Sequence, residues 1–328
     1  MGRTTQTKRT KRKTMKHASW KVAALGAFAF SVLLLRAGTP PVAAAASDPV
    51  IAAAGDIACD LLPTAATPDP DERGTEVCHM AATAALIKAL RPAAVLALGD
   101  EQYADGRLDQ FQAGYDKSWG AFKDITHPAP GNHEYHTPGA AGYYGYFGAS
   151  AGDPAKGYYS FELGGWHLIS LNGNCKAVGG CAADSPQTAW LVKDLAAHRA
   201  ACTLAYWHQP RFSSGAVHGN DPAYDAFWRA LYAAHADVVL NGHDHEYERF
   251  APQTPDAMAD AKGITEFVVG TGGRSHYHFA QVQPNSKATN ATAFGVLALT
   301  LHPHGFDWRF IAEPGSTFTD AGSQGCHG

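Results

Sequence analysis

Seven side chains with oxygen or imidazole donors follow short apolar runs of the sequence. They are Asp56, Asp100, Tyr103, Asn132, His208, His243 and His245. Each is unremarkable alone, because Asp after Gly is common in turns and a single His is usually structural. Open α/β sheets, however, bind their ligands beyond the carboxyl ends of the strands. The repeated choice of ligand-type residues at such positions therefore predicts one polar site that collects them at a sheet edge.

The apolar runs that precede these residues have the length and composition of buried strands. They cover residues 49–54, 93–98, 203–207 and 237–240. Helical segments are predicted between them at residues 75–90, 185–197 and 222–234, the second opening with Ser185 as N-cap and Pro186 at the first helical position. The later segments 158–171, 264–269, 294–301 and 306–311 have no helices between them and are predicted as antiparallel strands. The order predicts two sheets packed face to face with helices outside.

The charge is distributed unevenly along the 328 residues. Residues 1–46 hold nine of the 26 basic residues and none of the 30 acidic ones, so the remainder has a formal charge of −13. The basic segment precedes an apolar stretch at residues 22–35, which is shorter than the roughly 20 residues of a spanning helix. This layout predicts a secretory signal peptide over residues 1–46. A retained membrane anchor and a basic nucleic-acid-binding segment are the competing interpretations.

Residues 47–328 are predicted to form one domain outside the cell. Hydrophobic residues make up 45% of the chain and charged residues 17%, which excludes a disordered protein and a small disulfide scaffold. All six cysteines lie in this part, where export would allow disulfides to persist. Proximity and loop composition favour the pairs Cys59–Cys78 and Cys175–Cys181, leaving Cys202 with Cys326. A thiolate metal site is the alternative, but no CxxC spacing occurs.

Taken in order, the polar motifs are GD, GDxxY, GNHE, a strand-terminal His and GHxH. This series resembles the calcineurin-like metallophosphoesterases, and the Tyr of the second motif resembles their purple acid phosphatase branch. HEYER at residues 245–249 and the later VVGTGG extend the resemblance, which runs from about Val50 to Gly273. It implies an α/β fold: a four-layer αββα metallophosphoesterase sandwich with two mixed β-sheets flanked by helices. Larger plant-type relatives carry a β-sandwich domain before the first motif, so this chain is expected to be a short, secreted, bacterial-type catalytic domain.

The resemblance also implies two metal ions held by the seven residues. One ion would be bound by Asp56, Asp100, Tyr103 and His245, and the other by Asp100, Asn132, His208 and His243, with Asp100 bridging. A phenol has a pKa near 10 and needs a strongly acidic cation to ionise at neutral pH, which favours iron(III) beside Tyr103. The amide, carboxylate and imidazole donors of the second set suit a divalent ion such as zinc, manganese or iron(II).

The function implied is that of a secreted phosphoric monoester hydrolase. A metal-bound hydroxide would attack phosphorus in line, and no residue need be phosphorylated. His133 adjoins a ligand without being one and is the first candidate for the proton donor to the leaving group; His218, in a GAVHGND loop, is the second.

Two other functions remain open. The same two-metal centre can serve a phosphodiesterase acting on nucleotides or lipid head groups. A secreted metal-binding protein without turnover is the alternative from another class. The substrate is expected to be a small phosphate ester, with neither a nucleic-acid scaffold role nor a stable membrane anchor. The Cys59–Cys78 loop and residues 139–157 are expected to wall the cleft, although the aromatic side chains of the latter could equally pack the loop itself.

Overall fold

The computed structural model describes Gly2 and residues 48–62 and 78–327. Residues Ala46–Gly328 form one compact unit, and it is this unit that is described below. The predicted signal peptide lies outside the described residues apart from Gly2. Among the helices of the described segments, none has both the length and the apolar character needed to cross a membrane.

Two mixed β-sheets carry the fold. The six-stranded sheet has the order β13-β12-β11-β1-β2-β3, and the seven-stranded sheet has the order β10-β8-β9-β7-β6-β5-β4. The first contains β1 Val50–Ala54, β2 Ala94–Ala97, β3 Thr126–Pro128, β11 Gly295–His302, β12 Gly305–Ala312 and β13 Ala321–Gly325. The second contains β4 Tyr159–Leu163, β5 Trp166–Ser170, β6 Cys202–Tyr206, β7 Val238–Asn241, β8 Tyr247–Phe250, β9 Thr265–Val269 and β10 Ser286–Asn290. Each sheet contains a group of parallel strands: β1, β2 and β3 in one, and β5, β6, β7 and β9 in the other.

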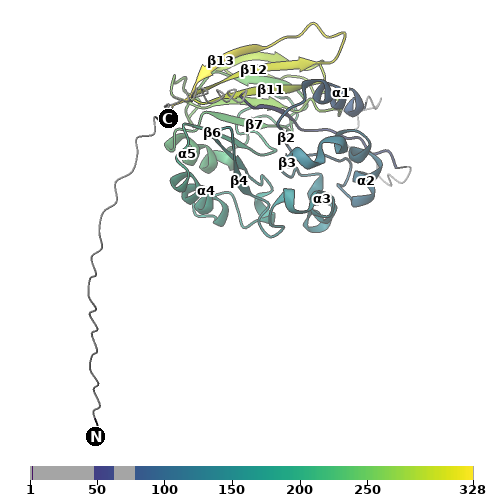
Figure 1. Cartoon of the computed structure of the whole chain (residues 1–328). Helices are drawn as coiled ribbons and strands as arrows, with labels where there is room; N and C mark the ends of the chain where they lie inside the picture. The colour runs from purple at the N-terminus through teal and green to yellow at the C-terminus, as the bar shows by residue number, and fades with distance from the viewer. Residues whose placement is uncertain (1, 3–47, 63–77, 328) are drawn as a thin grey trace, which may run out of the picture. The chain divides into compact units, whose positions relative to one another are not determined.

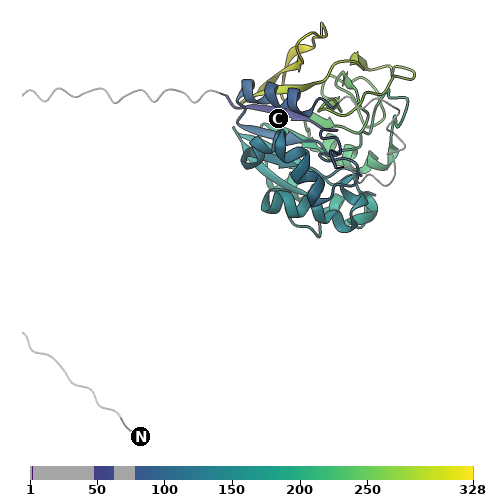
Figure 2. The same ribbon diagram turned by 90° about the vertical axis from the view of Figure 1, so that its right-hand side faces the viewer.

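Helices lie on the outer faces of the sheets. The α-helices are α1 Met80–Leu90, α2 Leu108–Ala113, α3 Ala141–Phe147, α4 Pro186–Ala197 and α5 Asp225–Ala233. Short 3-10 turns lie between them at Tyr115–Lys117, Trp119–Ile125, Glu134–His136, Pro138–Ala140, Gly148–Ala151, Cys175–Ala177 and Pro222–Tyr224. Figure 1 shows α4 and α5 side by side near β4 and β6, and Figure 2 turns the α1–α3 side toward the viewer. The predicted four-layer arrangement of two mixed sheets flanked by helices is confirmed.

The side chains of the buried strands alternate between two hydrophobic clusters. In β6, Leu204 and Tyr206 belong to the cluster that includes side chains of both sheets, whereas Ala205 packs with the cluster under α4 and α5. The same alternation occurs in β7, where Val238 and Val239 face opposite clusters. Successive strand side chains point to opposite faces, so a strand buried on both faces must be apolar at every position. This requirement explains why the runs predicted from sequence were continuous rather than alternating.

The boundaries differ from prediction where local chemistry intervenes. The segment predicted at 158–171 is two strands, β4 and β5, because Gly164 and Gly165 both adopt positive φ and form a two-residue hairpin turn. β5 and β9 also pair in parallel with a neighbouring strand, which corrects the expectation that they are purely antiparallel. Helix α1 begins at Met80, later than predicted. Ser185 caps α4 as predicted, accepting a hydrogen bond from the backbone N–H of Thr188.

The segment 139–157 is not a loop that walls a cleft with exposed aromatic side chains. It contains α3, whose Tyr143, Tyr144, Tyr146 and Phe147 are all buried. Phe111 of α2 lies against this group, with its ring stacked on that of Tyr146 at 5.0 Å between centroids. Of the two interpretations left open by the sequence, the packing one is therefore correct for these side chains.

The three disulfides are those predicted. They join Cys59 to Cys78, Cys175 to Cys181 and Cys202 to Cys326. The third closes a loop of 124 residues and ties the C-terminal segment to the first residue of β6. A covalent tie over so long a loop restricts the unfolded chain, an effect of a few kcal/mol on the free energy of unfolding.

The hydrogen bonds of Asp320 indicate that acid should destabilise the pairing of β12 with β13. Its carboxylate accepts hydrogen bonds from Tyr247 Oη at 2.7 Å, from the Arg249 guanidinium at 2.7 and 2.9 Å, and from Trp308 Nε1 at 3.2 Å. Burial alone would raise the pKa of Asp320, but Arg249 and Tyr247 outweigh burial and hold the pKa below its usual value. We expect Asp320→Asn to lower the free energy of unfolding by about 2 kcal/mol at pH 7, as measured by urea denaturation.

The sign of the pH dependence follows from the lowered pKa. The contribution of an acid whose folded pKa is depressed is present above its unfolded pKa, about 3.9, and is lost as the pH falls through the folded pKa. The difference between the wild-type protein and Asp320→Asn should therefore shrink below about pH 4. Asp307→Asn is the matched control, because Asp307 lies on β12, the strand that pairs with β13 directly after Asp320, but its side chain is 55% exposed. A difference for Asp320→Asn that stays constant between pH 7 and pH 3 would contradict this account.

Candidate metal centre

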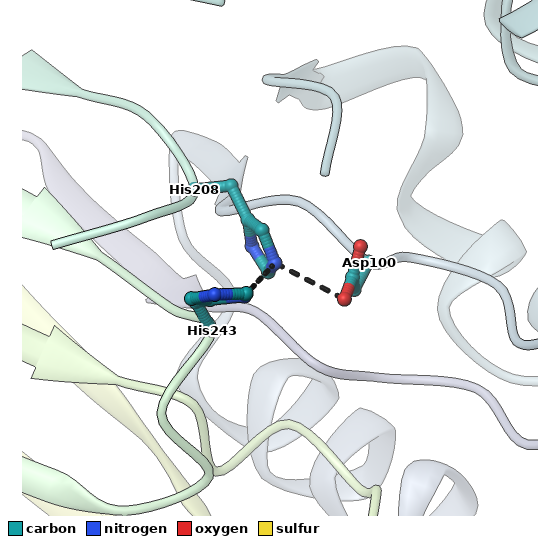
Figure 3. A group of neighbouring side chains, drawn as sticks. All are labelled: Asp100, His208 and His243. Carbon is teal, nitrogen blue, oxygen red and sulfur yellow. Dashed lines mark hydrogen bonds and ion pairs between the residues drawn. The ribbon is translucent and has the colours of Figure 1, made fainter. Parts of the chain in front are cut away.

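The carboxyl ends of the parallel strands of both sheets meet at one edge. Asp56 follows β1, Asp100 follows β2 and Asn132 follows β3 in the first sheet. His208 follows β6, and His243 with His245 follows β7 in the second sheet. Figure 3 shows three of these side chains, Asp100, His208 and His243, pointing toward one another. Their ligand atoms lie within 4.8 Å of one another, so the set could hold a metal ion.

Tyr103 lies at the centre of the first predicted ligand set. Its hydroxyl oxygen is 3.0 Å from Asp56 Oδ1, 3.2 Å from Asp100 Oδ2 and 3.0 Å from His245 Nε2. His245 Nε2 is also 3.2 Å from Asp56 Oδ1. A phenol has one proton and cannot donate to both carboxylates at once. Four donor atoms converging in this way fit a cation better than they fit a complete set of hydrogen bonds.

The second predicted set shares Asp100 with the first. Asp100 Oδ2 is 3.0 Å from His208 Nε2, and that nitrogen is 3.2 Å from His243 Nδ1. Two ring nitrogens that face each other and a carboxylate offer lone pairs to a common point. Asn132 Oδ1 is buried and accepts no hydrogen bond from any described residue. A buried amide oxygen without a donor is costly, and a metal ion would satisfy it.

Hydrogen bonds to the backbone set the orientation of two imidazoles. His208 Nδ1 is 2.8 Å from the Leu98 carbonyl oxygen, and His245 Nδ1 is 2.7 Å from that of Ser275. A ring nitrogen beside a carbonyl oxygen must donate its proton, so in the neutral ring Nε2 carries the lone pair directed toward the centre. Outer contacts of this kind are typical of histidine ligands, so the orientation of both rings is compatible with metal binding.

The backbone at the centre adopts conformations that are rare for residues other than glycine. Asp56, Asp100 and His243 have φ angles of 60°, 45° and 70°. Left-handed residues of this type cost free energy and are concentrated at functional sites. Gly131 lies so close to Asp100 that a Cβ at position 131 would overlap the carboxylate oxygen of Asp100. The glycine of the GNHE motif is therefore required by the approach of the Asn132 loop to Asp100.

Burial and mutual charge determine the protonation of the centre. Burial opposes ionisation of Asp100, but His208 and His133 hold its pKa well below the usual value. Burial also lowers the pKa of His208, yet Asp100 and Asp56 outweigh it and raise this pKa to about 9. Burial, then Asp100 and Asp56, raise the pKa of Tyr103 well above 10. The protein alone keeps Tyr103 a neutral phenol, so a phenolate here requires a strongly acidic cation.

His133 and His218 lie beside the ligands. His133 Nδ1 is hydrogen-bonded to the Ala104 carbonyl oxygen, and its Nε2 is 3.8 Å from Asp100 Oδ2. The His218 ring stacks on that of His243 with 3.8 Å between centroids. Both proton-donor candidates are thus adjacent to the centre.

Three residues around the centre were not singled out from the sequence. Glu134 is fully buried and accepts backbone N–H bonds from Asp100 at 3.0 Å, Gln102 at 3.2 Å and Gly131 at 2.8 Å, which fixes two ligand-bearing loops together. Arg274 places its guanidinium 4.7 Å from the Tyr103 ring centroid, and Tyr277 stacks on His245 at 4.0 Å. In the sequence, the position of Glu134 in the GNHE motif and of Arg274 directly after VVGTGG could have pointed to these two residues.

A model of the calcineurin-like phosphoesterase family matches residues 49–247, which is more than half of the chain. The chain belongs to the calcineurin-like phosphoesterase family. The match contains the whole set of strand-end residues from Asp56 to His245. This confirms the family predicted from the order of the motifs.

Purple acid phosphatases are among the relatives. The chain is 34% identical to purple acid phosphatase 15 of Arabidopsis thaliana over 128 residues, which make up 38% of this chain and 23% of that protein. The structure of purple acid phosphatase PPD1 from yellow lupin seeds superposes with a TM-score of 0.65 at 18% identity, covering 85% of this chain and 54% of the lupin chain. GAP50, described as the anchor in the inner membrane complex of Plasmodium, gives a TM-score of 0.60 at 14% identity, covering 86% and 90%. The chain thus spans about half of the lupin protein, and its match covers about a quarter of the Arabidopsis one.

Proposed function

We propose that this protein is a binuclear metal-dependent phosphoester hydrolase that acts on phosphate monoesters. The observation that carries the proposal is the position of Asp100 between two donor sets, one around Tyr103 and one around His208. Asp56, Asp100, Tyr103 and His245 would hold iron(III), and Asp100, Asn132, His208 and His243 would hold zinc, manganese or iron(II). When bound, the two ions would polarise the phosphoryl oxygens and lower the pKa of the attacking water.

The residues around the ligands would complete the reaction. His133 faces the centre through Nε2, because its Nδ1 is bonded to the Ala104 carbonyl oxygen. From that position its imidazolium can give a proton to the departing alkoxide. His218, stacked against His243, is the second candidate for this proton donor. Asp56 and Asp100 are 0% and 2% exposed, so little water competes for their charge.

Replacing His133 should affect proton transfer more than metal binding. We expect His133→Gln to lower kcat by about 10²-fold on an alkyl phosphate, and less on an aryl phosphate whose leaving group needs less protonation. Metal content should stay at the wild-type value. Steady-state kinetics on the two esters, with elemental analysis of the same samples, would measure both effects.

His136→Gln provides a matched control for that experiment. His136 also faces the Ala104 carbonyl oxygen, at 3.1 Å, and its ring lies 4.6 Å from that of His133, yet its side chain is 50% exposed. It should leave the rates on both esters near wild type. Equal losses on both esters for His133→Gln, accompanied by loss of metal, would show instead that His133 supports the metal centre.

A panel of esters tests the class of substrate. The metal-loaded protein should hydrolyse aryl and alkyl monoesters, with lower rates on the corresponding diesters. Activity confined to diesters would replace the monoesterase proposal by a phosphodiesterase. No hydrolysis of any ester by a fully loaded protein would favour a metal-binding role, which the fold alone permits.

We infer that residues 1–46 are a signal peptide and that residues 47–328 form the exported catalytic domain. The basic and then apolar layout of the segment supports this, as do three disulfides, which persist mainly in oxidising compartments. Sequencing the N-terminus of protein recovered from the medium should give a start near residue 47. Protein retained in the cells with residues 22–35 intact would contradict the inference.

A further inference from the structure

A second group of metal-ligand side chains lies away from the strand-end centre. His167 of β5, Asp194 of α4 and His198, the C-cap of α4, each offer a ligand atom, and these atoms lie within 4.8 Å of one another. His167 is near the beginning of β5, whereas the strand-end centre lies beyond the ends of the parallel strands. The two groups are therefore separate sites.

Glu162 orients His167 in the way that second-layer carboxylates orient histidine ligands. Glu162 Oε1 is 2.7 Å from His167 Nδ1, and the other ring nitrogen, Nε2, is 2.8 Å from Asp194 Oδ2. A carboxylate on one ring nitrogen fixes the ring and increases the electron density that the other nitrogen donates to a metal. Asp194 is itself held in place by Ser160, whose hydroxyl donates to Asp194 Oδ1 at 2.9 Å.

The third side chain, His198, is the exposed member of the group. His198 lies one helical turn after Asp194, its Nδ1 is 2.9 Å from the Asp194 backbone carbonyl oxygen, and its ring stacks on that of His167 at 4.5 Å. Nδ1 therefore donates its proton to that carbonyl, and Nε2 is the nitrogen left to bind an ion. The His198 side chain is 44% exposed, whereas those of His167 and Asp194 are 1% and 8% exposed.

A cavity of about 700 Å³ adjoins the exposed side of the group. It lies between the ends of α4 and α5, and His198 is part of its lining. Of the three side chains, His198 is therefore the one that an ion in the cavity would meet. With both imidazoles neutral, the carboxylate of Asp194 and the nearby carboxylate of Glu162 would together balance the charge of a dication.

We propose that His167, Asp194 and His198 form an auxiliary zinc site. Two imidazoles and a carboxylate, with a fourth position left to solvent, are a donor set that Zn²⁺ adopts in proteins. The bound ion would join the C-terminal end of α4 to β5 and so stabilise the outer layer of the second sheet. The site does not depend on the proposed hydrolase activity.

Zinc binding to the full mature chain tests the proposal. Metal-stripped protein is equilibrated with Zn²⁺ alone, desalted and analysed for zinc, and the urea midpoint is measured with and without zinc. Wild-type protein should retain one more zinc ion per chain than His198→Ala. Zinc should also raise the urea midpoint of the wild type more than it raises the midpoint of the variant. Both proteins keep the strand-end centre, so the difference between their zinc contents counts only the ion bound at His167, Asp194 and His198.

Two further variants make the outcome unambiguous. Glu162→Gln should weaken zinc binding at this site by about 10- to 100-fold without removing a ligand. His302→Gln is the matched control, since His302 is an exposed histidine between two carboxylates, Asp48 and Asp307, and should not alter zinc binding. Equal zinc content and equal zinc-dependent stabilisation in the wild type, His198→Ala and Glu162→Gln would overturn the proposal. In that case the group is a hydrogen-bonded imidazolium between two carboxylates.

Discussion

Asp100→Asn should abolish most of the hydrolysis and remove metal from both halves of the strand-end centre. Asp100 is the one predicted ligand that contacts the Tyr103 hydroxyl and the His208 ring together. The substitution removes a negative charge that is 2% exposed and leaves the buried imidazole of His208 without its carboxylate. Breaking a buried charge pair costs about 4 kcal/mol, which corresponds to a loss of about 10³-fold in rate if it falls on the reacting state.

Steady-state kinetics and elemental analysis of the purified variant would measure this effect. Asp105→Asn is the control, because Asp105 is on the same loop but its side chain is 47% exposed and pairs with Arg107. The backbone contact of Asp100 Oδ1 with the His133 N–H at 2.9 Å can be retained by the amide oxygen, so the fold should survive. An Asp100→Asn protein that keeps two metal ions and its activity would contradict the bridging role.

Tyr103→Phe should separate the iron proposal from the hydrolase proposal. A phenolate bound to iron(III) gives a visible charge-transfer band, and removing the hydroxyl must remove that band. The hydroxyl also contacts Asp56, Asp100 and His245 within 3.2 Å, so its loss should weaken binding of the ion in this half by about 10- to 100-fold. The ion held by His208 and His243 should remain.

The visible spectrum and the metal content of the variant are the measurements for this second prediction. Tyr144→Phe is a suitable control, since Tyr144 is a buried tyrosine of α3 whose hydroxyl lies near that of Tyr135, at 3.5 Å. It should leave the band unchanged. A wild-type protein that is colourless and fully active with two divalent ions would overturn the assignment of iron(III) while leaving the two-metal proposal intact.

Much of the fold could be predicted from sequence because its central strands are buried on both faces. Continuous apolar runs such as residues 203–207 and 237–240 are typical of strands buried on both faces. Ser185 with Pro186 marks the start of a helix by backbone chemistry alone. The edge strands β10 and β13 were not predicted, because they are polar or glycine-rich and depend on a neighbouring strand. Helix α3 was missed for a similar reason, since its glycines and tyrosines form a helix only when packed against α2. The inner strand β8 was also missed, since its four residues are too few to give a strand pattern.

Some residues around the candidate metal centre could likewise be predicted from local sequence, and others could not. The seven candidate ligands could be singled out because they lie beyond the ends of strands and are of a ligand type. Glu134 could not be, because its role comes from accepting N–H groups of residues more than thirty positions away in the sequence. Arg274 and Tyr277 follow β9, and only the parallel pairing of β9 with β7 brings them to Tyr103 and His245. Their contacts depend on sheet order, which local patterns do not encode.

The most direct test of the central claim is a titration of hydrolysis against bound metal. Metal-stripped mature protein is given iron(III) and one divalent ion in increasing amounts, and the rate on an aryl phosphate monoester is measured at each ratio. We expect the rate to rise with occupancy of both halves and to reach its maximum when one ion of each kind is bound at the strand-end centre. Full activity in metal-stripped protein, or a fully loaded centre without hydrolysis of any phosphate ester, would contradict the account.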